Sequence, residues 1–548
     1  MVPVNDINPL DPIVVSNSMT DLIISKEFVL KKLNVLKINT SPEPDLNHPK
    51  VLYELRDVIS PYLCHLFEQS LFQGKIPNDW KMSSVTVIHK KGKKNCVENY
   101  RPISLTCITC KIMESLVRDH IMHYFKSNNL FSKFQYGFIT GRSVSVQLLR
   151  VLDDWTSAVD KGSQVDIVYT DFEKAFDKIS HPHLISKLYS YGINNKVVEW
   201  ISCFLSHRMQ RVKVNGILSD AQMVPSVVPQ GSVLGPLLFV IYINDLPEVC
   251  RELSLLFLFA DDAKMYRAID SNADQLLLQE SCHNMFRWAT DWCMNLNISK
   301  CKVLTLSVNK SKILHYDYAL GSNNNNSMGT LESVTSISDL GVTVDSELSF
   351  STHIYDKINK AYQILGIVNR NFNNLDNKSF LLLYKSLVRS VVEFASSVWS
   401  PYKIGQIYDL ERVQKRATKL ISSCRKCNYK ERLMYLKLPT LKFRRARGDM
   451  IEVYKILHGF YDKDIVPSLP RSNYLATRGH SLKLLHVRSH YDLKKYSFCS
   501  RVVGLWNLLP DSVVNALSIN GFKNCLDKFW AKEEMYFDRK ADLIGSIM

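Results

Sequence analysis

Long apolar runs are absent from this sequence of 548 residues. The longest, Val233 to Ile243, contains Gly235 and Pro236 and is far shorter than the ~20 residues that a membrane-spanning helix needs. No leader with basic, apolar and small-residue regions opens the chain, and the 13 cysteines have no regular spacing. These absences exclude a spanning helix and a disulfide framework, and they predict a reducing intracellular compartment and no membrane partner.

A complete set of zinc ligands is missing as well. Two CxxC pairs occur, Cys107/Cys110 and Cys424/Cys427, but neither is followed at finger-like spacing by a second pair of Cys or His. Structural zinc is therefore not expected, and the thiols are interpreted as half-buried side chains. Internal repeats are absent too, and the one low-complexity stretch is the asparagine run at 321–329, after which the chain is predicted to be mainly helical.

Positive charge, by contrast, is abundant. The chain has 69 Lys and Arg against 53 Asp and Glu, a formal net charge of +16, in a composition of 46% apolar and 22% charged residues that is typical of soluble globular proteins. The length allows about three to four domains. An excess of this size favours a polyanionic partner, with nucleic acid ahead of an anionic membrane surface.

Much of this excess is local, because residues 411–450 hold thirteen Lys and Arg against three acids. A helix over 408–421 is predicted there, with Leu410, Val413, Ala417, Leu420 and Ile421 as its buried stripe. Its cations follow the spacing i, i+3, i+4, i+7, at Arg412, Lys415, Arg416 and Lys419. This ladder has the spacing to follow a phosphate backbone, and the alternative is a solvated basic face.

The order of elements between residues 166 and 308 predicts a fold. A buried strand ("VDIVYTDF") is followed by an Asn215–Gly216 turn of the type I′ hairpin kind, a helix over Gly231 to Asp245, and two strands around Asp261. A helix with an apolar face (Leu278, Met285, Trp288, Trp292) and a strand ("KVLTLSV") complete the set. This is the ferredoxin-like split βαβ order, which brings the end of the first strand beside the turn between the middle two.

Three carboxylates lie at those two places, at Asp171, Asp261 and Asp262. Two carboxylates 4 Å apart repel by about 4 kcal/mol at an effective dielectric of 20, so an opposite charge is expected between them. Magnesium prefers oxygen ligands and typically binds one or two protein carboxylates together with substrate phosphates. The sequence therefore predicts a divalent-metal site for in-line phosphoryl transfer, and the alternative is an aspartate-rich surface turn.

Several motifs, in order and in spacing, resemble those of the reverse transcriptases of non-LTR retrotransposons, the jockey-like LINE class. The palm-like motifs are "YTDFEKAFDKISH" (169–181), "PQGSVLGPLLFVIYINDL" (229–246), "FADD" (259–262) and "LNISKCKVL" (296–304). The fingers-like motifs are "NYRPISLTCITCKIMESLVRDHI" (99–121) and "QYGFITGRSVSVQLL" (135–149). Post-palm and thumb-like segments follow at 339–354 and 410–421.

The resemblance implies a role for particular residues. Asp171 and Asp261, with Asp262 beside them, would be catalytic and would hold two Mg²⁺ ions, for which Mn²⁺ is a possible substitute. Phe176 would press against the sugar and exclude a 2′-hydroxyl. The remaining nucleotide-binding residues would be Gln230 and Gly231 along the nucleotide, Arg101 and Lys90 or Lys91 on the triphosphate, and Lys300 near the leaving pyrophosphate.

The fold class expected from the resemblance is α+β, a right-hand polymerase with fingers, a ferredoxin-like palm and a helical thumb, followed by a mainly helical C-terminal region. The expected domains are an N-terminal helical extension (1–75), fingers (76–160), palm (161–320), post-palm strand and basic thumb (330–430) and a basic C-terminal region (431–548). The implied function is that of an RNA-directed DNA polymerase, with an RNA template, a DNA primer or target and dNTPs as partners. A nuclear location is expected from the family.

Some features depart from the family pattern. Glu43 and Leu46 stand where two glycines are usual, which puts a positive-φ turn there in doubt, and Val227 stands where a glycine usually precedes "VPQG". No endonuclease is expected upstream of the fingers. Two alternatives therefore stay open, a non-catalytic nucleic-acid-binding remnant of a retrotransposon and a nucleotidyl cyclase on a similar sheet.

Overall fold

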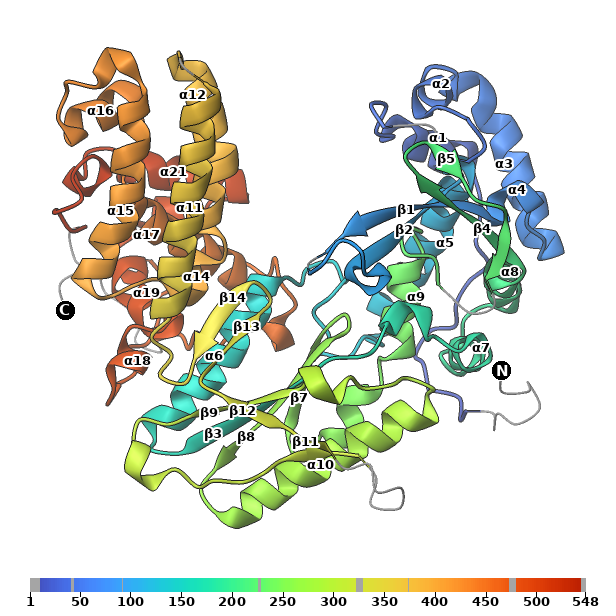
Figure 1. Ribbon diagram of the computed structural model, residues 1–548, viewed down its shortest axis with the longest axis horizontal. Coiled ribbons are helices and arrows are strands. Elements are labelled where there is room, and N and C mark those ends of the chain that lie inside the picture. The colour runs from blue at the N-terminus through green and yellow to red at the C-terminus, as the bar shows by residue number, and fades with distance from the viewer. Residues whose placement is uncertain are drawn as a thin grey trace.

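The computed structural model describes residues 10–40, 44–90, 92–224, 228–321, 329–372, 374–472 and 480–543. Figure 1 shows a central sheet from which two arms rise on the same side, one built from N-terminal segments and one from C-terminal helices. Helices and strands are mixed along the chain, which confirms the expected α+β class. No helix in the described ranges combines the length and the apolarity needed to cross a bilayer.

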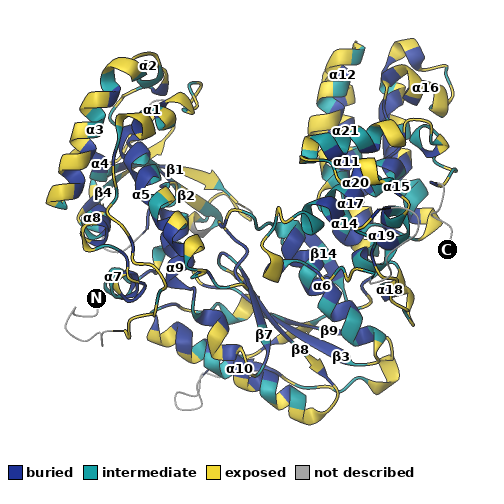
Figure 2. Ribbon diagram, turned by 180° about the vertical axis from the view of Figure 1, so that it is seen from behind, coloured by how far each residue is buried: buried dark blue, intermediate teal, exposed yellow. Residues whose placement is uncertain are grey.

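The central sheet has the predicted ferredoxin-like order. Its strands are β3 (Gln164–Thr170), β7 (Leu255–Phe259), β8 (Asp262–Ile269), β9 (Lys302–Leu306) and β12 (Glu332–Val334), arranged β12-β9-β3-β8-β7. β3 lies between β8 and β9, antiparallel to both, and β7 is antiparallel to β8. β3 reads as an apolar run because it is central and buried on both faces, as Figure 2 shows.

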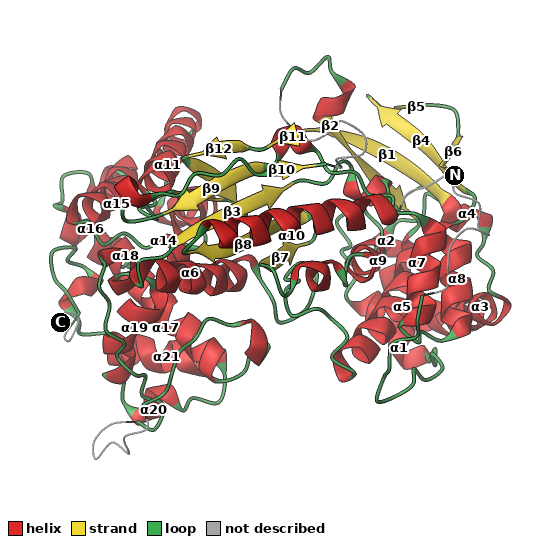
Figure 3. Ribbon diagram, turned by 90° about the horizontal axis from the view of Figure 1, so that it is seen from below, coloured by secondary structure: helices red, strands yellow, loops and turns green. Residues whose placement is uncertain are grey.

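Two helices connect these strands. α10 (Asn272–Asp291) begins with a capping box between Ser271 and Asp274 and lies across one face of the sheet (Figure 3). Its predicted apolar face is buried, including Leu278 and Met285. α9 (Gly235–Tyr242) is apolar and buried all round, and it is shorter than the predicted helix because residues 229–234 form a loop before it.

A second sheet lies in the N-terminal arm. It contains β1 (Met82–His89), β2 (Tyr100–Thr106), β4 (Arg208–Val214), β5 (Ile217–Leu218) and β6 (Gln222–Val224). Asn215 (φ 49°) and Gly216 (φ 86°) both adopt positive φ between β4 and β5, which confirms the predicted type I′ hairpin. The hairpin joins this sheet because β4 pairs in parallel with β1.

Helices pack around the second sheet. They are α1 (Lys26–Asn34), α2 (Pro49–Glu54), α3 (Arg56–Gln73), α4 (Asn78–Lys81), α5 (Ile108–Ser127), α7 (His181–Ser190) and α8 (Asn195–Leu205). α6 (Val144–Asp160) packs near β3 and leads towards the C-terminal arm. The short strand pairs β10 (Ala319–Leu320) with β11 (Gly329–Thr330), and β13 (Ser336–Asp339) with β14 (Val342–Asp345), precede that arm.

The C-terminal arm is helical, as predicted. Its helices are α11 (Ser351–Asn371), α12 (Asn377–Leu383), α13 (Ser390–Glu393), α14 (Ser396–Trp399), α15 (Ile404–Ala417), α16 (Tyr429–Leu436), α17 (Leu441–Leu457), α18 (Asp492–Lys495), α19 (Phe498–Asn507), α20 (Asp511–Val514) and α21 (Ile519–Phe529). The helix predicted over 408–421 begins at Ile404 and tightens into a 3-10 turn at Thr418–Leu420. In that turn Leu420 is only half-buried, which corrects its assignment to the apolar stripe.

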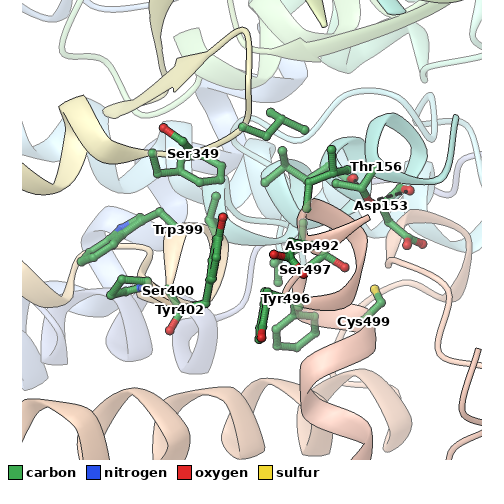
Figure 4. Close-up of a pocket in the computed structure, with 18 residues that line it drawn as sticks. Asp153, Thr156, Ser349, Trp399, Ser400, Tyr402, Asp492, Tyr496, Ser497 and Cys499 are labelled. Carbon is green, nitrogen blue, oxygen red and sulfur yellow. Dashed lines mark hydrogen bonds between the residues drawn. The ribbon is translucent and has the colours of Figure 1, made fainter. Parts of the chain in front are cut away.

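The C-terminal arm is attached to α6 by a buried ion pair. Lys494 Nζ lies 2.8 Å from Asp153 Oδ1, and both side chains are about nine-tenths buried. Figure 4 shows the neighbouring cavity, which is lined by Trp399 and Tyr402 together with Asp492 of α18 and Cys499 of α19. The cavity holds only about 40 Å³, roughly room for one or two waters, so this junction is a structural contact rather than a nucleotide site.

The cysteines are free thiols, as expected. Cys107, Cys110 and Cys424 are buried and Cys427 is partly buried, so the CxxC pairs serve packing. Burial raises the pKa of Cys107 to about 12, which keeps this thiol protonated.

The doubt about a positive-φ turn near Leu46 is resolved by the backbone. Leu46 adopts φ 60° and is exposed, so the turn forms without a glycine, while Glu43 and Val227 lie outside the described residues. A left-handed conformation costs a non-glycine residue about 1–2 kcal/mol, partly offset by the greater chain entropy that glycine loses on folding.

Leu46→Gly is therefore expected to raise the free energy of unfolding by about 0.5–1 kcal/mol. Urea denaturation of the purified chain measures this change. Leu55→Gly, at an exposed leucine with negative φ, is the matched control and is expected to destabilise. A destabilised Leu46→Gly variant would contradict the strain at this position.

Candidate active site

Strand register brings the predicted aspartates to one end of the central sheet. Thr170, the last residue of β3, pairs with Ala263 of β8, so Asp171 follows directly beside Asp262. β7 and β8 are joined by a two-residue turn, Ala260–Asp261, closed by the pairing of Phe259 with Asp262. All three carboxylates therefore come from the ends of neighbouring strands, as the topology predicts.

The aspartates influence one another electrostatically. Burial, Asp261 and other nearby acids raise the pKa of Asp262 to about 6. Burial and the Asp171 carboxylate raise the pKa of Asp261, while Arg101 and Lys90 act in the opposite direction. Raised pKa values mean that the protein alone does not neutralise this negative charge, which is the expected signature of a site for a cation.

Lys300 is the direct counter-ion of Asp171. Its Nζ lies 2.8 Å from Asp171 Oδ2, and both side chains remain partly exposed. The segment carrying Lys300 is tied to the end of β3, because Asn297 N donates a 2.8 Å hydrogen bond to Asp171 O. The sequence-predicted residue Lys300 thus lies at the carboxylates, and an exposed ion pair of this kind is weak enough to exchange for another cation.

A cavity of about 320 Å³ opens beside Asp171 and Asp262. Lys300, Lys302 and residues of the β13–β14 hairpin are also part of its lining. Within the described part of the chain, no three His, Cys, Asp or Glu side chains are gathered as a ready-made metal cage. The hard oxygen donors nevertheless fit a divalent cation of the Mg²⁺ type, which binds through one or two carboxylates and takes its other ligands from water and substrate phosphates.

The predicted triphosphate cations come from the second sheet. Arg101 lies on β2 and Lys90 follows β1, and both are exposed. Their charges lower the pKa of Asp261, so they are close enough to act on the same anions. Lys91 lies outside the described residues.

The predicted nucleotide-contact residues lie between the two sheets. Phe176 is half-buried, stacks on Phe239 with ring centroids 4.4 Å apart, and meets the exposed ring of Phe138 edge-on. Gln230 O accepts a 2.7 Å hydrogen bond from Ser104 N of β2. Gly231 adopts φ 128°, and a Cβ there would lie 2.3 Å from Ser104 O, so glycine is required where this loop crosses β2.

Two supporting groups were not predicted from the sequence. Glu114 of α5 is fully buried and its Oε2 accepts hydrogen bonds from Val233 N and Leu234 N, which fixes the loop that carries Gln230. Lys264, two residues beyond Asp262, forms a buried 2.5 Å ion pair with Asp339 of the β13–β14 hairpin. Only an unusual charge within an apolar strand pattern, as at Lys264, could have indicated such a role.

The basic window 411–450 divides between interior and surface. Four of its arginines are used inside the C-terminal arm: Arg432 and Arg445 are buried, Arg444 pairs with Glu393, and Arg447 pairs with Asp527. The sequence suggested that these charges were available to a partner, but in the structure they are buried or paired with acids of the same chain. The local excess of positive charge at the surface is therefore smaller than the sequence indicates.

The predicted ladder, which runs along α15 and ends at Lys419 in the following 3-10 turn, stays at the surface. Arg412, Arg416 and Lys419 are exposed and Lys415 is partly so, although Arg412 also pairs with Asp409 at 2.8 Å. Burial and the neighbouring cations Arg539 and Lys419 lower the pKa of Lys415. Arg416, Lys419 and Arg425 line a groove against α11, which favours an anionic occupant.

Asp262→Asn is expected to stabilise the protein in metal-free buffer, with a gain that grows between pH 3.8 and about 6 and is complete above that range. Below the ordinary pKa of 3.8 the carboxyl is protonated in both folded and unfolded chains, so it has no effect there. As the pH rises to about 6, the unfolded chain loses this proton first and the folded state loses stability.

The Asp262 side chain is exposed to solvent, although protein atoms crowded around it still disfavour its charge. Solvent screening therefore keeps the expected gain near 2 °C in apparent melting temperature at pH 7.5, with little near pH 4. Thermal unfolding across this range measures it, with Asp270→Asn at the other end of β8 as the control. An equal shift at pH 4 would contradict the carboxylate repulsion.

The topology of the central sheet, the carboxylates at its end and the facing cations define a domain of the polymerase type. Residues 88–344 match the family model described as reverse transcriptase (RNA-dependent DNA polymerase). Residues 88–344 therefore resemble a reverse transcriptase domain, and the similarity to jockey and X-element polymerases agrees with the non-LTR, LINE type that the motifs predicted.

Known relatives come from mobile elements. The chain is 29% identical to the RNA-directed DNA polymerase from mobile element jockey of Drosophila melanogaster over 60% of its own length and 36% of the relative's. It is 26% identical to the probable RNA-directed DNA polymerases from transposon X-element (66% and 40%) and from transposon BS (73% and 45%) of the same species. The chain thus spans about two fifths of the length of these relatives.

Proposed function

We propose that the chain is an RNA-directed DNA polymerase with a right-hand arrangement. The central sheet would be the palm, the second sheet with its basic β1–β2 hairpin the fingers, and α11 to α15 the thumb. The substrates would be an RNA template, a DNA primer or target, and dNTPs. The carrying observation is the convergence of Asp171, Asp261 and Asp262 at one end of the palm sheet, faced by cations from the fingers.

A role in nucleotide binding is proposed for each of the groups around the carboxylates. Arg101 and Lys90 would attract the triphosphate, and arginine's planar fork suits phosphate oxygens. Phe176, held between Phe239 and Phe138, would form the wall beside the sugar. The loop at Gln230 and Gly231, held by β2 and Glu114, would run along the nucleotide.

Reverse transcriptases use divalent metal ions, and we propose two Mg²⁺ ions here, with Mn²⁺ as a substitute. Asp171 and Asp261, with Asp262, would hold them, and when bound they would supply charge stabilisation for in-line displacement at the nucleotide phosphate. Lys300 now neutralises Asp171 and would be released towards the phosphate side.

The direct test is extension of oligo(dT) on poly(rA) by the purified chain, with and without Mg²⁺. Incorporation of dTTP that depends on both template and metal is expected. Binding of the hybrid without incorporation, under Mg²⁺ and Mn²⁺ alike, would overturn the polymerase and leave the nucleic-acid-binding remnant. Metal-dependent conversion of a free nucleotide without a primer would instead favour a cyclase.

Lys419→Ala is expected to weaken hybrid binding evenly across sequences. Removing one phosphate contact should reduce the slope of log K against log salt by about 0.9 on a duplex. Fluorescence anisotropy at several salt concentrations measures the slope. Lys196→Ala, at an exposed lysine of the N-terminal arm, is the control and should leave the slope unchanged. An unchanged slope in Lys419→Ala would show that Lys419 does not contact the hybrid.

A further inference from the structure

The segment 134–138 includes the start of the fingers-like motif at 135–149. It runs beside β7, the strand that leads into the turn with Asp261. Leu258 N donates a 2.9 Å hydrogen bond to Phe134 O, Tyr136 N donates a 2.8 Å bond to Leu258 O, and Gln135 forms a parallel bridge with Leu258. The segment thus extends the sheet at the strand end that carries the catalytic turn.

The Gln135 side chain reaches into that turn. It is fully buried, and its Oε1 accepts hydrogen bonds from Ala260 N at 2.9 Å and from Gly137 N at 2.7 Å. Ala260 directly precedes Asp261 and adopts φ 54°, a left-handed conformation that is unfavourable for alanine. Such strain persists only where the surroundings hold it in place, and here the Gln135 carboxamide bonds the strained residue itself.

Two neighbours complete this support. A Cβ on residue 137 would lie 2.4 Å from Ala260 N, so only glycine lets the segment approach the turn. Gln147 of α6 donates from Nε2 to Leu258 O at 3.0 Å, and it also lines the cavity with Asp171 and Asp262. The backbone before Asp261 is therefore held from the side opposite β8.

We propose that Gln135 is a positioning residue for catalysis: its carboxamide holds Ala260 in the left-handed conformation and thereby sets where Asp261 and Asp262 project. Gln135 touches neither nucleotide nor metal and acts through the turn. The inference rests on the proposed polymerase function for its kinetic consequences, while the hold on Ala260 stands independently of activity.

Three variants separate positioning from general stability. Gln135→Met removes the acceptor at similar volume, whereas Gln135→Glu keeps an oxygen in the same place. Gln279→Met is the matched control, because Gln279 of α10 is also buried and also bonds a backbone, through Oε1 and Nε2 to the N–H and C=O of Ala319. All three are compared for melting temperature, kcat, KM for dTTP and the Mg²⁺ concentration at half-maximal extension.

Gln135→Met is expected to lower kcat about 10–100-fold, since misplacement by about an ångström has effects of this size. The half-maximal Mg²⁺ concentration should rise, with KM for dTTP nearly unchanged. Gln135→Glu should recover most of kcat, and Gln279→Met should change melting temperature only. If Gln135→Met matches Gln279→Met in kcat and Mg²⁺ dependence, the inference is overturned although the polymerase stands.

Hydrogen exchange provides a readout that needs no activity or substitution. The Ala260 amide lies in a two-residue turn yet donates to a buried acceptor, so slow exchange is expected in the wild-type chain and in Gln135→Glu. Fast exchange at Ala260 in the wild-type chain would overturn the inference, even if Gln135→Met fails to fold. An inactive wild-type chain with a protected Ala260 amide would overturn the proposed function and leave the hold on the turn intact.

Discussion

Asp261→Asn is expected to reduce primer extension to background, a loss of at least ~10³-fold, while RNA–DNA hybrid binding stays near the wild-type level. Asparagine keeps the shape of the side chain in the β7–β8 turn but removes the charge that a divalent cation needs. Hybrid affinity is instead expected to depend on exposed cations such as those of α15, the proposed nucleic-acid contacts. Single-nucleotide extension and anisotropy on the same preparation measure both quantities.

The same substitution also predicts a thermal signature. Because a ligand that binds only the folded state stabilises it, millimolar Mg²⁺ with dTTP and hybrid should raise the melting temperature of the wild-type chain more than that of Asp261→Asn. Asp270→Asn, at an exposed aspartate on the far end of β8, should behave as wild type in both assays. Extension retained by Asp261→Asn would remove the carboxylate site from the mechanism.

Phe176→Val is expected to admit ribonucleotides. The ring is held on one side by Phe239, stacked at 4.4 Å, so it cannot retreat from a 2′-hydroxyl without disturbing a buried neighbour. Removing the ring should raise kcat/KM for UTP relative to dTTP by about 10–100-fold, the range that steric discrimination in a pocket supplies. Steady-state incorporation of each nucleotide on poly(rA)/oligo(dT) gives the ratio.

A control is needed because shortening a half-buried phenylalanine also loosens its surroundings. Phe286→Val on α10 makes the same chemical change at a half-buried ring far along the chain from the nucleotide motifs. It should lower stability without altering the UTP/dTTP ratio. A ratio that moves equally in both variants, or in neither, would count against Phe176 as the sugar wall.

Sequence patterns were sufficient for four strands of the central sheet, β3, β7, β8 and β9, whereas β12 had not been predicted. The alternation of strand-like and helix-like segments between residues 166 and 308 predicted the strand order, and the positions of Asp171 and Asp261 at strand ends predicted that they would meet. The Asn215–Gly216 turn was equally readable, because few residues besides asparagine and glycine adopt two consecutive positive φ angles easily. These signals are local, so neighbouring residues alone carry them.

Other features had no local signal. Leu46 and Ala260 adopt left-handed conformations that their residue types disfavour, since tertiary contacts outweigh intrinsic preference there. Gln135 and Glu114 look like ordinary polar residues in the sequence. Only in the folded chain do their side chains accept hydrogen bonds from backbone N–H groups of distant segments. Arg432 and Arg445 were expected to contribute to the surface charge, but both side chains are buried in the structure.

The sequence by itself determined which segments become most of the strands and helices, where the acidic residues stand in them, and which family residues 88–344 resemble. Periodicity, turn residues and motif order are properties of residues close together in the chain. Only the tertiary structure decided that β4 to β6 join β1 rather than the central sheet, and that a buried glutamine holds the turn before Asp261. Those outcomes depend on packing between segments more than 100 residues apart, which no local pattern records.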